Sequence, residues 1–104
     1  MTCESKQWSA VARREGERRR LRVEGRMECL TDGHRLELAP TNEGIYDDPK
    51  VIALRLRITE PENATEIISE EVVVWETTID DEVETIRVRI DGTMGQRLTV
   101  TNEE

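Results

Sequence analysis

The chain has 104 residues, the length of one small domain, and we expect a single domain over residues 1–104. It carries 23 acidic and 15 basic side chains, a formal net charge of −8, and repulsion from phosphate therefore argues against a general nucleic-acid binder. No run of about 20 apolar residues occurs, which excludes a membrane-spanning helix. We expect neither nucleic acid nor a membrane among its partners.

β-Branched residues dominate the composition, with nine Val, eight Ile and eleven Thr against five Ala. These side chains fit a pleated sheet and lose rotamer freedom in a helix, so the composition favours strands. The aromatic set is Trp8, Tyr46 and Trp75, which leaves aliphatic side chains to form the core.

The segment over 7–13 has two interpretations. Trp8, Val11 and Ala12 have the spacing of one helix face, whereas Trp8, Ala10 and Ala12 alternate as in a strand. We expect a strand because the rest of the chain is so uniformly β, although the pattern itself leaves both open.

Residues 20–30 alternate strictly between polar and apolar side chains, which predicts a half-buried strand. Its apolar positions are Leu21, Val23, Met27 and Cys29. Gly25 on the same side indicates a bulge or a close backbone approach. The arginines around its start are expected to be solvated and paired with nearby glutamates; they are Arg18, Arg19, Arg20 and Arg22.

Asp32 and Gly33 follow this strand directly. An Asp-Gly pair between alternating segments predicts a two-residue hairpin turn, because both turn positions need a positive φ. The register of that hairpin would place apolar residues opposite one another on one face. The facing pairs would be Cys29 with Leu36 and Met27 with Leu38.

The next segments are a loop, two strands and a turn. Pro, Gly, Asn and Asp are frequent over 39–50, which predicts a loop, and an alternating strand follows over 52–58. Residues 66–78 have apolar side chains on both faces, as in a strand that is buried on both faces or that contacts a partner. A turn is expected over 80–82.

Two further strands complete the chain. The strand over 86–90 alternates, with Arg87 and Arg89 on its polar side. A five-residue loop over 91–95, with a glycine near each end, is expected to lead into the last strand over 97–101. The facing pairs would be Val88 with Leu98 and Ile86 with Val100.

Six or seven short strands with turns at nearly regular spacing predict an all-β fold, an antiparallel β-sandwich. The strand count is Ig-like in size. The Cys…Trp…Cys spacing of immunoglobulin domains is absent, and the single tyrosine falls in a loop. The sequence therefore assigns neither a strand topology nor a family.

Groups that perform catalysis are scarce. His34 is the only histidine, and none of the three serines lies in a Gly-x-Ser-x-Gly elbow. Cys29 faces Leu36 rather than His34 in the predicted hairpin, which disfavours a cysteine–histidine nucleophile. We expect no enzyme activity and no cofactor.

Cys3 and Cys29 are the only cysteines. They can form a disulfide if the first strand packs beside Cys29, whereas free thiols are the default in the cytosol. A zinc site that also used His34 would lack a fourth ligand. No apolar signal segment follows Met1, so the expected location is the cytoplasm, with a secreted mature chain as the alternative.

Several aspartates fall in predicted loops, and loops at one end of a sandwich can converge to bind Ca²⁺. The calcium candidates are Asp47, Asp48, Asp80, Asp81 and Asp91. No twelve-residue calcium loop is present, and acidic turns usually serve turn geometry and solubility. No metal site is therefore assigned, and a small-ligand or calcium-binding sandwich is the alternative function.

The segment 67–75 is the candidate interface, because either face that it exposes keeps apolar side chains. If Val72 and Val74 fill the core, the exposed residues are Ile67, Val73 and Trp75. The opposite assignment exposes Val72 and Val74. The first strand or the 39–50 loop, including Tyr46, would otherwise cover this face. We expect a non-catalytic interaction or assembly module that binds a protein partner or itself.

Overall fold

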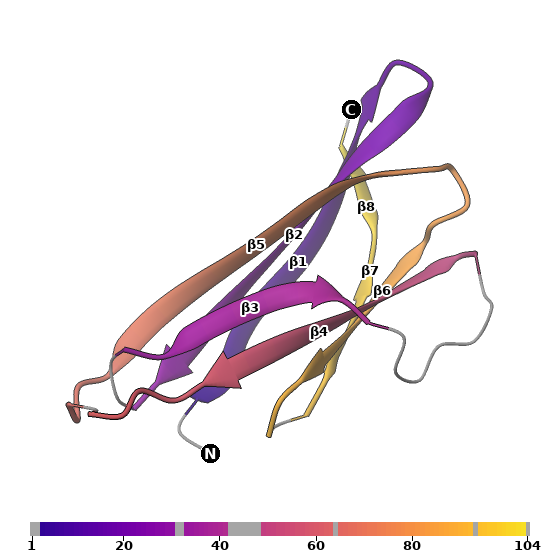
Figure 1. Ribbon diagram of the computed structural model, residues 1–104. Helices are drawn as coiled ribbons and strands as arrows, with labels where there is room; N and C mark the ends of the chain where they lie inside the picture. The colour runs from indigo at the N-terminus through magenta and orange to yellow at the C-terminus, as the bar shows by residue number, and fades with distance from the viewer. Residues whose placement is uncertain (1–2, 31–32, 42–48, 64, 93, 104) are drawn as a thin grey trace.

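Two four-stranded sheets pack face to face in the computed structural model, which describes residues 3–30, 33–41, 49–63, 65–92 and 94–103 (Figure 1). The strands are β1 (Cys3–Glu15), β2 (Arg18–Cys29), β3 (Arg35–Pro40), β4 (Val51–Thr59), β5 (Ser69–Ile79), β6 (Thr85–Ile90), β7 (Gln96–Thr99) and β8 (Thr101–Glu103). One sheet has the order β5-β2-β1-β8 and the other β3-β4-β6-β7. The predicted sandwich is confirmed. Each sheet also contains one parallel pair, β1 with β8 and β4 with β6, so both sheets are mixed.

β1 and β2 form the longest hairpin, which settles the ambiguous N-terminal segment as a strand. Glu15 pairs with Arg18 across a two-residue turn whose first residue, Gly16, has a φ of 67°. Glycine fits this position because it adopts positive φ without steric cost. Farther along, Trp8 packs over Gly25, where an added Cβ would lie 2.5 Å from the indole ring. Gly25 therefore accommodates the Trp8 side chain, where the sequence suggested a bulge or a close backbone approach.

The hairpin predicted at Asp32 and Gly33 is wrong. β2 and β3 belong to different sheets, so this connection crosses the sandwich; Asp32 itself lies outside the described residues. Cys29 and Leu36 both contribute to the core, but from opposing sheets. Period-2 alternation reports which side of a strand is buried and not which strand is its neighbour.

The turn expected over 80–82 is present at Asp81 and Glu82, but it leads across the sandwich and not into a neighbouring strand of the same sheet. β5 lies beside β2, and the chain then crosses to β6, which runs parallel to β4. The β6–β7 hairpin exists with a different register from the predicted one, because Ile86 pairs with Leu98 and Val88 with Gln96.

The last predicted strand divides at Val100, which is buried. β7 ends just before it in one sheet, and β8 begins just after it beside β1 in the other. The C-terminal strand and the β1–β2 turn consequently lie at the same end of the molecule (Figure 1).

The core lies between the two sheets and is aliphatic, as the composition predicts. Its largest fully buried side chains are Leu21, Met27, Leu54, Leu56, Ile86, Val23, Val88 and Cys29. Trp8 and Trp75 pack at its margin. These are the inward positions of alternating strands, so the periodicity located the core residues correctly.

Arg19 is buried, which corrects the expectation that the whole arginine group around the start of β2 is solvated. Its guanidinium donates hydrogen bonds to Asn102 Oδ1 at 2.7 Å and to the backbone oxygens of Asp80 and Val83 at 2.7 and 2.8 Å. Arg19 therefore joins β2 to β8 and to the crossing that precedes β6.

Candidate interaction surfaces

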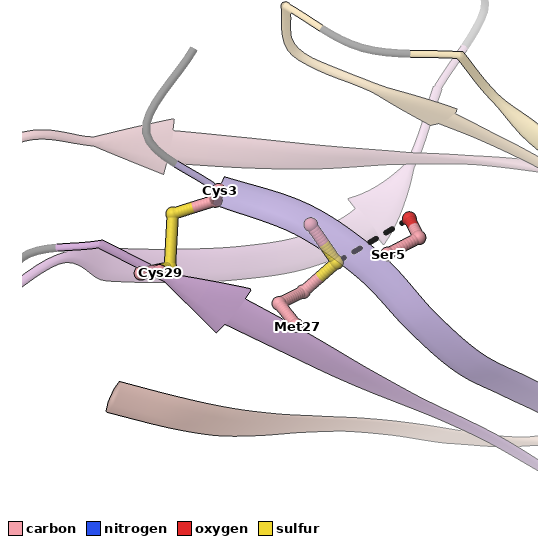
Figure 2. Close-up of a disulfide and its surroundings, with 4 residues drawn as sticks. All are labelled: Cys3, Ser5, Met27 and Cys29. Atoms are coloured by element: carbon pink, nitrogen blue, oxygen red, sulfur yellow. Dashed lines mark hydrogen bonds between the residues drawn. A yellow bond between two sulfur atoms is a disulfide. The ribbon is translucent and has the colours of Figure 1, made fainter. Parts of the chain in front are cut away.

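Cys3 and Cys29 are joined by a disulfide across β1 and β2, at positions that pair directly in the sheet (Figure 2). Both are buried. The disulfide considered from the sequence is present in the structure. Met27 and Ser5 form the next inward pair of the hairpin, where the Ser5 hydroxyl donates a hydrogen bond to the Met27 sulfur.

His34 lies beside this disulfide, although the predicted hairpin separated it from Cys29. The imidazole and the two sulfurs lie within 4.8 Å of one another, and all three residues are buried. Both sulfurs are consumed by the disulfide, so this state offers no thiolate as a nucleophile or as a zinc ligand.

The described calcium candidates do not converge. Asp80 and Asp81 precede β6, whereas Asp91 follows it, which places them at opposite ends of a six-residue strand. Each carboxylate accepts a donor of this chain: Asp80 from the Glu82 amide, Asp81 from Arg14 at 2.6 Å and Asp91 from Arg55 at 3.0 Å. Asp47 and Asp48 lie outside the described residues.

The segment 67–75 exposes a different set of side chains from the one assigned as the interface. Val73 is 8% exposed, and Trp75 packs against the core. Their pairing with Gly25 and Val23 fixes this orientation, because partners across a ladder share a face. Ile67 is exposed as expected. The remaining exposed apolar residues of the segment are Ile68, Val72 and Val74. Tyr46, which the sequence suggested as a residue that covers this segment, lies outside the described residues.

β5 is an edge strand of unusual regularity. It pairs with β2 over eleven consecutive residues, Ser69 to Ile79, without a bulge, and β2 lies on only one side of it. No backbone hydrogen bond from another described segment reaches Glu70–Ile79 on its other side. Part of β3, the edge of the opposite sheet, lies next to β5. Such an edge presents unpaired backbone groups to a further strand.

The other edge of the same sheet is protected. β8 covers β1 only at Val11–Arg13, and the uncovered part of β1 carries a bulge between Ser5 and Gln7. Lys6 lies in this bulge, and a hydrogen bond to Glu4 at 3.0 Å raises its pKa, so the charge persists at this edge. A bulge and a lysine are two devices that prevent edge-to-edge pairing, and β5 has neither.

Comparison with known proteins adds no assignment, because no family model, curated protein or solved structure matches the chain. No helix of the described residues is long and apolar enough to cross a membrane. The interpretation of function therefore depends on the surfaces of the sandwich.

Proposed function

We propose that this domain is a non-catalytic assembly module that self-associates by pairing β5 of one copy with β5 of a second. The observation that carries the proposal is the eleven-residue, bulge-free edge of β5, with Val72 and Val74 exposed on its outer side at 51% and 43%. Addition of a strand would satisfy the backbone groups of the edge and bury these valines.

The sequence of β5 favours an antiparallel register centred on Val74 over one centred on Val73. Pairing centred on Val73 would place Glu70 directly opposite Glu76 of the other copy, and directly opposed like charges are destabilising. Pairing centred on Val74 places Glu70 opposite Thr78 instead. Both registers keep inward residues facing inward in both copies, so either one extends the sheet without exposing the core.

The scarcity of histidine and serine in the sequence supports a non-catalytic role. The single histidine lies beside a buried disulfide, and the chain has only three serines. The disulfide also supports an oxidising compartment, because structural disulfides are rare in the cytosol. We therefore favour a secreted chain over a cytoplasmic one.

Sedimentation from about 1 to 100 μM tests the module, and we expect a concentration-dependent species of twice 12.0 kDa. Val74→Lys should return the protein to the monomer with its fold retained, because this side chain is exposed and an edge lysine opposes strand pairing. The substitution reduces the net negative charge, so weaker association would come from the local change at the Val74 pair, where two lysines would face each other, and not from a larger net charge.

Met94→Lys is the matched control, since it changes the net charge equally, and Met94 is 84% exposed and lies outside β5. It should associate as the wild type does. A monomer at every concentration, or equal association by Val74→Lys and the wild type, would overturn the proposal.

A further inference from the structure

Arginine side chains occupy the outer face of the β3-β4-β6-β7 sheet, in positions that alternate with the inward-facing core residues of the same strands. We call this surface the arginine face; its members are Arg35, Arg55, Arg57, Arg87, Arg89 and Arg97. The acidic residues described on the same face are Glu37, opposite Arg57, and Asp91 at the end of β6. A strongly basic surface thus lies on a chain of net charge −8.

Like charges face one another directly across the strands of this face. Arg87 pairs in register with Arg97, and Arg55 pairs with Arg89. Arg55 also contacts Asp91 at 3.0 Å. Arg57, Arg87 and Arg97 form no ion pair with any residue that the structure describes. Directly opposed like charges destabilise a sheet, so a bound anion would relieve the repulsion that the folded chain retains between Arg87 and Arg97.

We propose that the arginine face binds an extended acidic segment of a partner protein. Arg87 and Arg89 lie two residues apart on β6, which corresponds to about 6.7 Å along a strand. An extended peptide repeats its side chains on one side at the same interval, so carboxylates at alternate positions match the arginines one to one. Guanidinium groups bind carboxylates through paired hydrogen bonds, which gives the match directional specificity.

A protein segment fits this face better than a nucleic acid does. Single-stranded nucleic acids bind where aromatic side chains stack on bases next to the basic groups. Both tryptophans belong to the other sheet, on β1 and β5, and no aromatic residue lies on the described strands of the arginine face. The long-range field of an acidic chain also opposes a large polyanion more than a short segment.

The test uses fluorescein-labelled octapeptides in anisotropy titrations at about 50 mM salt. One peptide alternates glutamate and serine, and the second has the same composition with its four glutamates contiguous. We expect the alternating peptide to bind at least about threefold more tightly, and its affinity to fall with added salt. Equal affinity for the two peptides would overturn the register match.

The double variant Arg87→Glu and Arg97→Glu should lower affinity for the alternating peptide by at least about tenfold, because it reverses the centre of the face. Its matched control is Arg13→Glu with Arg18→Glu, which changes the net charge equally at exposed positions of β1 and β2. The control should lose at most about threefold. Equal losses in the two double variants would overturn the proposal, since they would show a response to net charge alone.

Further measurements distinguish an acidic peptide from other ligands of the arginine face. Tighter binding of an oligothymidylate, or of vesicles with anionic lipid, than of the alternating peptide overturns the proposal. Loss of self-association in the Arg87 and Arg97 double variant assigns the face to a second copy of the chain and overturns it as well. Val74→Lys should bind the peptide as the wild type does, so failure of β5 pairing and failure of the arginine face remain distinguishable.

Discussion

The outer faces of the two sheets carry arginines at the same strand period but in opposite electrostatic surroundings. On the β5-β2-β1-β8 sheet, glutamates of β5 face the arginines of β2: Arg20 and Arg22 lie near Glu76, and Arg26 lies 3.5 Å from Glu70. On the arginine face, the direct neighbour of Arg87 is Arg97.

Like charges also face one another on the first sheet, where Arg13 pairs with Arg20. The two faces differ because β5 brings glutamates within reach of the β2 arginines, whereas Arg87 and Arg97 have no such acidic neighbour among the described residues. Exposed ion pairs contribute only about 0–1 kcal/mol each, so the glutamates of β5 chiefly neutralise their face. The arginine face has fewer acidic residues, Glu37 and Asp91, against its six arginines, and it therefore keeps the positive potential on which the proposed binding of an acidic segment depends. The two sheets also differ in covalent structure, because the disulfide lies in the neutralised sheet.

Of the changes that affect only one of the two sheets, removal of the disulfide should lower the free energy of unfolding the most. Cys3→Ser with Cys29→Ser should lower the free energy of unfolding by about 3.5 kcal/mol, since the bond closes a loop with a sequence separation of 26. Thermal denaturation followed by circular dichroism measures the effect. Wild-type protein in excess reductant should match the variant, and an unchanged melting temperature in reductant would contradict this expectation.

Replacement of Arg19 should give the next largest loss of stability. It compares a buried arginine of β2 with an exposed one on the same strand. Arg19→Met should destabilise the fold by about 2–3 kcal/mol, because it leaves the carbonyls of Asp80 and Val83 without their donor. Chemical denaturation provides the comparison with Arg20→Met, whose side chain is 44% exposed. The Arg20 variant should lose less than about 1 kcal/mol. Similar losses in both variants would show that the buried hydrogen bonds of Arg19 contribute little.

Reversing one charge on each outer face should give the smallest change in the free energy of unfolding. Arg97→Glu places a carboxylate opposite Arg87 and should stabilise the fold by about 0.5 kcal/mol, because a like-charged pair becomes an opposite-charged one. Glu76→Arg makes the reverse change beside Arg20 and Arg22 and should destabilise by a similar amount. Urea denaturation at low salt measures the sign of each change in the free energy of unfolding. Changes of the same sign for both substitutions would contradict the comparison of the two faces.

The sequence predicted burial well and strand neighbours poorly. Inward positions such as Leu54, Leu56 and Val88 follow from alternation alone, since that pattern depends on the two faces of a single strand. The Asp32–Gly33 hairpin failed for the same reason, because strands in opposing sheets show the same alternation as strands that pair. Neighbours depend on long-range pairing, which a local pattern does not contain.

The candidate surfaces were only partly predictable for a related reason. Ile67 was identified as exposed, but Val73 and Trp75 required the β2–β5 register before their direction was known. The arginines of β4 and β6 were visible on the polar sides of their strands. Their gathering into one face depends on the parallel pairing of those two strands, which nothing in the sequence indicated.

The position of the disulfide has a mechanical consequence. Cys3 and Cys29 lie at the open end of the β1–β2 hairpin, remote from the turn at Gly16, so the bond closes the hairpin into a ring. A pulling force that enters at Cys3 passes through sulfur to Cys29 and onward to β3, and the residues between them carry no tension. The segment between Cys3 and Cys29, about 90 Å of contour length, can therefore be extended only after the disulfide is reduced.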